Sequence, residues 1–420
     1  MTAATPAAAD SPAALAQPPD TPAPTPVIVV GAGLAGWTTV REFRKLDATT
    51  PLTLITADAG DFYAKPSLSN ALVHGKSPDQ LVSTAAASMA AAQNITLLAF
   101  TPVVSMDAAN RTVLTDKGRL PYRQLVLATG AQPIRVPVAG GAAGQVLSVN
   151  SLDDYKVFHA RLTQAGAPQR VVIMGAGLIG CEFANDLAAR GHQVSVADPA
   201  ASPMAALLPA QASLQLQAAL SALGVTWHFG ATVQSVEPLA GNLSQAGGLR
   251  VGLSSGQTLE ADLVLSAIGL RADTRLAAAA GLQVERGIVV NTALATSDPH
   301  IYALGDGAQY ASAGNRSLPY VMPIMQAAKV LAKNLTRLAI SGGESSPETL
   351  AFPLMPVAIK TPALPILVAA PAPGTPGEWQ TVEPGVWRFV DSHGQQRGFV
   401  LTGPQTARRS EWTQTTLSSA

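Results

Sequence analysis

The stretch PVIVVGAGLAGWTTVREFRKL, residues 26–46, decides the fold. A run of β-branched residues leads into a Gly-rich turn, and apolar residues at helical spacing follow, which predicts a buried strand, a tight turn and a helix. Gly31, Gly33 and Gly36 form GxGxxG at that turn. There the first glycine permits the turn, the second lets a pyrophosphate approach the backbone, and the third lets helix and strand pack closely. The helix N-terminus then offers unpaired N–H groups to phosphates.

The same pattern occurs twice along the chain. PLTLITAD, residues 51–58, predicts a second strand ending at Asp58, where a carboxylate meets a ribose hydroxyl. RVVIMGAGLIGCEFANDLAARG followed by HQVSVAD, residues 170–198, repeats the arrangement with Gly175, Gly177, Gly180 and Asp198. A tight βα turn without a ligand is the alternative interpretation of one copy. Two copies in the right context predict two dinucleotide sites, and so an electron relay from a nicotinamide to a flavin.

The order of strands and helices predicts an α/β fold with two doubly wound (Rossmann-like) dinucleotide-binding domains. RQLVLATGAQP and YALGDGA each place a strand before polar turn residues, Thr129–Gly130 and Gly305–Asp306. Because these two turns most naturally serve one site, we expect the second domain to be inserted in the first. The expected units are a disordered Ala/Pro-rich tail (1–25), an FAD-binding domain (26–147 and 271–341), an NADH-binding domain (148–270) and a small β-rich C-terminal domain (342–420).

Composition excludes several classes of function. With 27 basic and 27 acidic residues among 420, the chain has no overall basic field for nucleic acid or anionic membrane. Its single cysteine, Cys181, excludes an internal disulfide, a CxxC pair and a Cys-rich metal or iron–sulfur site. We find neither a signal peptide nor a long uncharged apolar run, which favours a cytoplasmic location without membrane insertion.

Each GxGxxG motif with its strand and helix is called a fingerprint below. Residues elsewhere in each unit indicate which cofactor the fingerprint holds. Asp306, at a strand end, could meet a ribityl hydroxyl and a pyrophosphate, although a simple turn aspartate is the alternative. Asp198 is followed by Pro, Ala, Ala, Ser and Pro, with no Arg or Lys to neutralise a 2′-phosphate. The second site therefore favours NADH over NADPH.

First fingerprint, ATG, second fingerprint and YALGD in this order resemble the two-dinucleotide flavoprotein reductases, the FAD-dependent pyridine nucleotide-disulfide oxidoreductase superfamily. The resemblance extends from about Pro26 to Thr402. Within it, YVMPIMQAAKVLAKNL and MPVAIKTPALPILV look most like the rubredoxin reductase family. That resemblance implies hydride transfer from NADH to FAD and single-electron transfer to rubredoxin, which would supply an oxygenase such as alkane hydroxylase or an oxygen-detoxifying reductase.

The resemblance also implies roles for matching positions. The FAD residues would be Gly31, Gly33, Leu34, Ala35, Gly36, Asp58, Lys65, Pro66, Val103, Thr129, Gly130, Gly305, Asp306 and Met322. The NADH residues would be Gly175, Gly177, Leu178, Ile179, Gly180, Glu182, Asp198 and Gly269. As catalytic candidates, Lys65 and Pro66 would lie close to the pyrophosphate or the isoalloxazine of FAD, and Glu182 would lie near the nicotinamide. Lys360 is a candidate for positioning the flavin or the partner. A surface lysine and an exposed helix carboxylate are the alternatives for Lys65 and Glu182.

Other functions stay open at this point. A ferredoxin reductase of an oxygenase or P450 system keeps the chemistry and changes the acceptor, but related enzymes usually carry arginine at position 65 and lysine at position 70. An NADH oxidase or peroxidase would need a redox cysteine where Asn70 stands. A flavin-binding redox-sensing scaffold belongs to a different class.

Rubredoxins are acidic as a family, so we expect a local basic surface. Two helix stripes could supply it, or could simply be solvated helix faces. The stripes are Lys329, Lys333 and Arg337, and Arg41, Arg44 and Lys45.

Overall fold

The computed structural model describes residues 25–239, 248–341 and 346–416. The predicted tail, residues 1–25, lies outside the described residues apart from Thr25. Within the described ranges, no helix combines the length and apolarity needed to cross a membrane.

The first fingerprint strand stands at the centre of a five-stranded parallel sheet ordered β20-β9-β1-β2-β5. Three of these strands are fully buried tetrapeptides, which explains their continuous apolar sequence. The chain leaves this sheet after β9 and returns much later as β20. The strands are β1 (Val27–Val30), β2 (Leu52–Ile55), β5 (Thr96–Leu98), β9 (Gln124–Leu127) and β20 (Ile301–Ala303).

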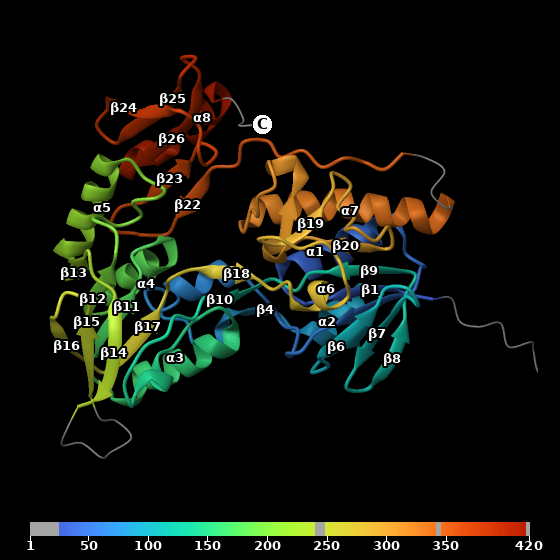
Figure 1. Ribbon diagram of the computed structural model, residues 1–420, viewed down its shortest axis with the longest axis horizontal. Helices are drawn as coiled ribbons and strands as arrows, with labels where there is room; N and C mark the ends of the chain where they lie inside the picture. The colour runs from blue at the N-terminus through green and yellow to red at the C-terminus, as the bar shows by residue number, and fades with distance from the viewer. Residues whose placement is uncertain (1–24, 240–247, 342–345, 417–420) are drawn as a thin grey trace, which may run out of the picture.

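Two long helices cover this sheet and pack against each other. They are α1 (Leu34–Leu46), which follows the first fingerprint, and α7 (Val321–Ser341). Trp37 and Phe43 of α1 join Leu331 and Leu335 of α7 in one apolar core with the strands. Figure 1 shows α7 lying across this end of the molecule, with α1 beside it.

The second fingerprint strand stands in a four-stranded parallel sheet ordered β13-β12-β11-β17. Its strands are β11 (Arg170–Met174), β12 (Gln193–Asp198), β13 (Thr226–Phe229) and β17 (Leu263–Ser266), and its helices are α3 (Leu152–Gln164), α4 (Leu178–Ala189) and α5 (Ala210–Ala222). Figure 1 shows this unit at the opposite end of the molecule from the first sheet. An antiparallel pair, β10 (Ala131–Pro133) and β18 (Leu270–Ala272), joins the two units where the chain leaves and returns.

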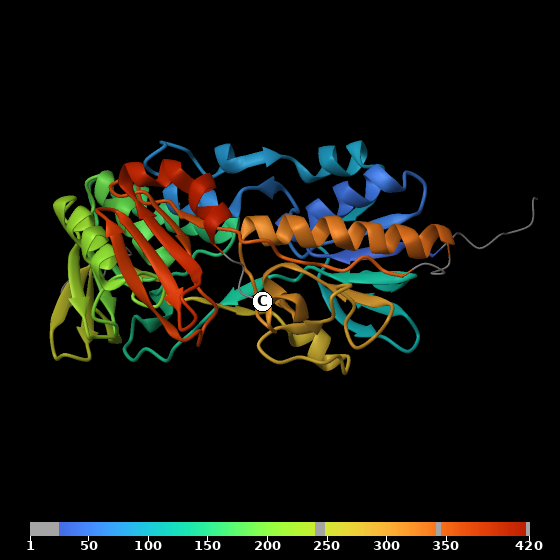
Figure 2. The same cartoon turned by 90° about the horizontal axis from the view of Figure 1, so that it is seen from above.

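The C-terminal region forms a five-stranded antiparallel sheet ordered β22-β23-β26-β25-β24. Its elements are β22 (Val357–Ile359), β23 (Ile366–Ala369), β24 (Gly377–Glu383), β25 (Val386–Asp391), β26 (Gln396–Thr402) and α8 (Arg409–Thr415). The sheet packs on α5, where Gln211 accepts hydrogen bonds from Thr381 and from the Trp387 indole. Figures 1 and 2 both show it next to the first turn of α7.

The remaining elements are short and connect these units. They are β3 (Phe62–Tyr63), β4 (Val82–Thr84), β6 (Val103–Asp107), β7 (Thr112–Thr115), β8 (Gly118–Pro121), β14 (Val233–Pro238), β15 (Leu249–Leu253), β16 (Thr258–Ala261), β19 (Ile288–Val290), β21 (Ala308–Tyr310), α2 (Ala86–Ala92) and α6 (Arg275–Ala279). The 3₁₀ helices used below are η1 (Lys65–Asn70) and η4 (Gly305–Gly307). The predicted α/β fold with two Rossmann-like units and a β-rich C-terminal part is confirmed.

Candidate active site

The two fingerprints fold into nearly the same turn. Gly31 has φ +108° and Gly175 has φ +103°, a region that side chains other than glycine rarely adopt. At the third glycines, Gly36 and Gly180, an added Cβ would overlap the carbonyl oxygen of the first glycine of the same turn. Helix and turn can therefore approach this closely only without a side chain.

The middle glycines face open space, which fits a dinucleotide pyrophosphate. A Cβ placed on Gly33 or on Gly177 would meet no atom of the described residues within 4 Å. Helices α1 and α4 begin there without a side-chain cap among the described residues, whereas Ser151 caps α3 in a full capping box. The first N–H groups of α1 and α4 therefore make no side-chain cap bond, as is also the case for α2 and α5, and phosphate binding at these two helix starts stays a prediction.

The predicted FAD residues of the first unit converge on its turn. An added Cβ on Gly31 would overlap the Ala128 carbonyl, directly before Thr129 and Gly130. The turn η4 closes on the start of α1, since a Cβ on Gly305 would lie 2.9 Å from Ala35. Strand ends distant in sequence therefore meet at the carboxyl edge of one sheet, where ligands of α/β folds bind.

Lys65 and Asp306 form an ion pair beside this turn. The Lys65 Nζ lies 3.9 Å from Asp306 Oδ2, and 39% of the lysine side chain and 17% of the aspartate side chain stay exposed. Partial burial lowers the pKa of the Lys65 ammonium and raises the pKa of the Asp306 carboxyl, while each charge opposes the shift of the other. This pairing is compatible with a site role for Lys65, which stays a prediction.

Three further predicted FAD residues lie on other elements of the first unit, and their contact with FAD stays a prediction. Asp58 follows β2 and accepts hydrogen bonds from the Thr56 hydroxyl and the Gly60 N–H. Val103 begins β6, two residues after Thr101, whose N–H bonds back to the Thr56 carbonyl. Met322 lies in the first turn of α7 and is 51% exposed.

The predicted NADH residues gather at the second turn. Asp198 accepts hydrogen bonds from Ala176 within the fingerprint, at 2.6 Å, and from Ala200, at 2.7 Å. Its carboxylate therefore lies at the turn itself. Gly269 follows β17 with φ +109°, and Ile179, in the first turn of α4, is 40% exposed.

Glu182 is not an exposed helix carboxylate: it is only 3% exposed. Its Oε2 accepts the Ser69 hydroxyl at 2.5 Å, and its Oε1 accepts the Lys360 N–H at 2.8 Å. Burial raises the pKa of the Glu182 carboxyl, and the two donors partly oppose that shift. The Lys360 ammonium donates to the Pro66 carbonyl at 2.7 Å. The segment of Lys65 and Pro66, the helix of Glu182 and the turn of Lys360 therefore meet at one point.

Sequence reasoning missed two neighbours of Glu182 on α4. Asn185 accepts the Ala363 N–H, and Asp186 accepts the N–H groups of Leu72 and Val73. The available signal was the run CEFAND, in which three polar residues interrupt an otherwise apolar helix.

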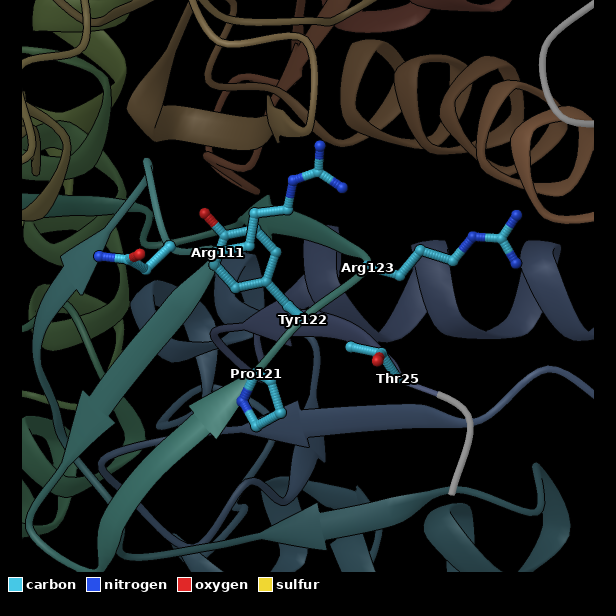
Figure 3. Close-up of a pocket in the computed structure, with 6 residues that line it drawn as sticks. Thr25, Arg111, Pro121, Tyr122 and Arg123 are labelled. Atoms are coloured by element: carbon cyan, nitrogen blue, oxygen red, sulfur yellow. The ribbon is translucent and has the colours of Figure 1, made fainter. Parts of the chain in front are cut away.

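Two surface pockets lie away from these turns. One, of about 410 Å³, is lined by Arg111, Tyr122 and Arg123 among others, at the amino ends of β1 and β9 (Figure 3). It is at the sheet edge opposite to the fingerprint turn. The other, of about 320 Å³, lies between α1 and α7, and we call it the lysine groove. Its charged lining residues are Glu42, Lys45, Lys329, Lys333 and Glu348.

The lysine groove corrects the expectation of two separate basic stripes. Lys45 pairs with Glu42, and Lys333 pairs with Glu348, so part of its positive charge is neutralised. Arg44 is not on this surface as a free cation, because it donates to the backbone carbonyls of Gln93, Asn94 and Asp47.

Two family models match the chain. The pyridine nucleotide-disulphide oxidoreductase model matches residues 25–330, and the model described as rubredoxin binding C-terminal domain matches residues 349–416. The chain belongs to the pyridine nucleotide-disulphide oxidoreductase family. This membership confirms the predicted class of enzyme, a flavoprotein oxidoreductase using FAD and NADH. The roles of individual residues in the two turns stay predictions.

Curated relatives agree along nearly the whole chain. The rubredoxin-NAD(+) reductase of Alcanivorax borkumensis is 42% identical over 90% of this chain and 95% of its own length. That of Acinetobacter baylyi is 41% identical, with 93% and 97% covered. The nitric oxide reductase FlRd-NAD(+) reductase of Aeromonas hydrophila is 40% identical, with 90% and 93% covered. The resemblance to rubredoxin reductases is confirmed.

Solved structures give the same picture at lower identity. A ferredoxin reductase from Rhodopseudomonas palustris superposes with a TM-score of 0.80 at 26% identity, covering 92% of this chain and 93% of that one. The putidaredoxin reductase chain of its covalent complex with putidaredoxin also gives 0.80 at 26%, with 93% of both chains covered. The water-forming NADH oxidase of Lactobacillus brevis gives 0.80 at 19% identity, which concerns the fold alone.

Proposed function

We propose that this protein is an NADH-dependent, FAD-containing rubredoxin reductase. The observation that carries the acceptor is the match of residues 349–416 to a rubredoxin binding C-terminal domain, in a chain whose other residues match the reductase family. The rubredoxin-NAD(+) reductases of Alcanivorax borkumensis and Acinetobacter baylyi support it over 90% or more of the chain. Residues 26–147 and 271–341 hold FAD in this proposal, residues 148–270 hold NADH, and residues 342–420 contribute to carrier binding. We place the enzyme in the cytoplasm.

The chain's own residues bind and orient the cofactors. FAD, when bound, accepts a hydride as two electrons and releases them one at a time. The uncapped start of α1 holds its pyrophosphate and the uncapped start of α4 holds that of NADH. The Lys65 ammonium supplies a positive charge in a partly desolvated site, where it stabilises negative charge on the reduced cofactor better than it would in water.

Asp198 sets the preference for NADH in this proposal. It is oriented by two backbone donors, and the residues that follow it carry no cation. Its carboxylate accepts a ribose hydroxyl and repels a 2′-phosphate.

The carrier docks where the C-terminal unit meets the first turn of α7. Val321 and Met322 are consecutive there and expose 39% and 51% of their surface. Lys329, in the lysine groove, follows Met322 by two helical turns, which is about 10 Å along α7. An acidic carrier seated on the apolar pair could therefore meet this lysine at its rim, where charge mainly accelerates association.

The test is a steady-state comparison of purified acceptors with the holoenzyme. We expect rubredoxin to be reduced at least about tenfold more efficiently than ferredoxin, and NADH to be preferred to NADPH by at least about tenfold. Equal efficiency with ferredoxin would refute the assignment. The second candidate acceptor is the FlRd protein, because the Aeromonas hydrophila relative is named a nitric oxide reductase FlRd-NAD(+) reductase, and it is compared in the same assay. A holoenzyme that NADH does not bleach would instead favour a redox-sensing scaffold.

Charge reversal tests the lysine groove. Lys329→Glu with Lys333→Glu should lower the rate of carrier reduction at low salt by about tenfold and weaken its salt dependence, without changing the rate of flavin bleaching by NADH. Lys76→Glu with Lys156→Glu is the matched control, because Lys156 also gives up one surface pair, with Asp153. If both double variants behave alike, the groove is not the steering surface.

A further inference from the structure

Helix α4 carries three buried polar side chains on one face. Glu182, Asn185 and Asp186 are exposed by 3%, 1% and 1%, in a helix whose other residues from Gly180 to Ala188 are apolar or glycine and buried. Spacings of three and four residues place them on the same side. Burying such groups is costly unless each is hydrogen-bonded, so their partners define what this face does.

Two of the three hold one segment of the first unit. The Asp186 carboxylate accepts the Leu72 N–H at Oδ2, at 3.0 Å, and the Val73 N–H at Oδ1, at 2.7 Å. Glu182 accepts the Ser69 hydroxyl on the same segment. Three donors from residues 69–73 therefore end on α4, although these residues belong in sequence to the first unit.

Apolar packing fixes the same segment in the same place. Leu68, Ala71 and Leu72 are buried in the core that contains Phe183 and Leu187 of α4, and not in the core of the first sheet. The segment is thus docked on the second unit by both its backbone and its side chains.

The segment docked on α4 extends back along the chain to Lys65, the residue paired to Asp306. The 3₁₀ helix η1 runs from Lys65 to Asn70, and at about 2.0 Å per residue it places Lys65 about 10 Å from Asn70, which precedes Leu72 by two residues. A short hydrogen-bonded helix transmits the position of one end to the other. The Lys65 ammonium, 3.9 Å from Asp306 Oδ2, therefore lies at one end of this segment, and the α4 contacts lie towards its other end, at Ser69, Leu72 and Val73.

We propose that Asp186 is a positioning residue: by accepting two backbone N–H groups of the segment Lys65–Val73, it holds the Lys65 ammonium beside Asp306 in the flavin site. The proposal rests on the proposed function, which places FAD at the turn of Gly31. It explains why a carboxylate is used. Both carboxylate oxygens accept here, whereas an amide offers one acceptor and would turn an NH₂ group towards the second N–H.

The groups that surround Asp186 affect the pKa of its carboxyl. Burial raises the pKa of its carboxyl to about 6, although the Val73 and Leu72 N–H groups, and then the charges of His74 and Arg190, act to lower it. Tyr155 faces it from α3, and burial first and the Asp186 charge second raise the pKa of that phenol. Asp186 is thus charged at neutral pH, where it can accept both bonds.

A double-mutant cycle on the FAD-loaded enzyme tests the proposal. Lys65→Met should shift the visible absorbance spectrum of the bound flavin, lower its midpoint potential and slow bleaching by NADH about tenfold. Asp186→Asn should change all three in the same direction by a smaller amount, about threefold in the bleaching rate. Because Asp186 acts through Lys65, adding Asp186→Asn to Lys65→Met should change nothing further, whereas a merely structural role would add its full effect.

Asn185→Ala is the matched control, one residue away on α4 and equally buried. Its bond goes to Ala363 of the C-terminal turn, so the flavin spectrum and potential should stay those of the parent enzyme. If Asp186→Asn does not fold, Ser69→Ala takes its place in the cycle, because it releases the same segment from Glu182. Two results would overturn the positioning role alone. One is additive effects in the cycle, and the other is an unchanged flavin spectrum in both Asp186→Asn and Ser69→Ala. An unchanged spectrum in Lys65→Met would overturn the placement of the flavin, and the positioning role with it.

Discussion

The two fingerprint helices begin alike and end up in different surroundings. From the third glycine onward, Thr38, Arg41 and Glu42 of α1 occupy the positions that Glu182, Asn185 and Asp186 occupy in α4. Glu42 reaches a surface ion pair with Lys45, whereas Asp186 is buried against two backbone N–H groups. The glycine turn is set by the need to hold a pyrophosphate, but the face of the helix behind it is set by what packs there. Helix α4 is enclosed by the first unit and the C-terminal unit, and its polar face joins them.

The largest effects should come from the third glycines, where the two halves are most alike. In Gly36→Ala and in Gly180→Ala the new methyl group would overlap the carbonyl oxygen of the first glycine of the same turn, Gly31 or Gly175. Relief requires the helix to move off its sheet, so we expect a loss of about 3 kcal/mol or more in unfolding free energy for each. Gly36→Ala should be recovered without flavin. Gly180→Ala should keep flavin and lose NADH binding. Thermal unfolding measures the loss of stability, and the flavin bound per protein measures FAD binding. Flavin loss in both variants would show that the two nucleotide-binding units do not bind their cofactors independently.

The middle glycines should separate stability from binding. A methyl group on Gly33 or Gly177 meets no described atom within 4 Å, so neither variant should change the unfolding temperature of the cofactor-free protein. Each methyl group would project into the space that a pyrophosphate needs. We expect Gly33→Ala to weaken FAD binding and Gly177→Ala to weaken NADH binding, each by about tenfold or more. Titration by fluorescence checks both, and a weakened fold without weakened binding would contradict the pyrophosphate assignment.

The acids after the second strands should differ in specificity. Asp198 is held by the fingerprint's own Ala176 N–H, and Asp58 is held by Thr56 and Gly60 outside the glycine turn. Asp198→Ala with Pro199→Arg should reduce the preference for NADH over NADPH by about a hundredfold. The double substitution removes the carboxylate that repels the 2′-phosphate of NADPH and adds an arginine that pairs with it. Asp58→Ala is the control, and its nicotinamide preference should equal that of the parent. A preference unaltered in both would place specificity elsewhere.

The glycine turns and the fold could be predicted from the sequence because they depend on local rules. A strand, a glycine with positive φ and a helix start together give a sequence motif within about ten residues. Two such motifs along the chain predict two dinucleotide-binding units. The family resemblance predicts a role for Lys65, but the ion pair of Lys65 with Asp306 depends on a contact between distant segments.

The contacts of α4 could not be predicted, since they join three segments far apart in the chain. A carboxylate in an apolar helix gives the same local pattern whether it is exposed or docked, so Glu182 was open to an exposed interpretation. The two basic stripes likewise gave no sign that α1 and α7 lie side by side and share one groove. Helix periodicity tells which residues share a face, and tertiary packing decides what that face meets.

The smallest effect compares the two helix acids through pH. Burial raises the pKa of the Asp186 carboxyl to about 6, above its ordinary value of 3.8, so the folded protein holds this proton more tightly than the unfolded chain. The stability linked to Asp186 is therefore greatest at low pH and is lost as pH rises through about 6. Relative to Asp186→Asn, which does not titrate, the parent should lose about 1 kcal/mol of unfolding free energy between pH 5 and pH 7. Glu42→Gln, at the equivalent position of α1, changes only a surface pair and should differ little from the parent at either pH. Urea unfolding of the three proteins measures these differences. The difference in unfolding free energy between the parent and Asp186→Asn could instead be the same at both pH values. Asp186 would then be charged throughout this range, because its two N–H donors outweigh its burial.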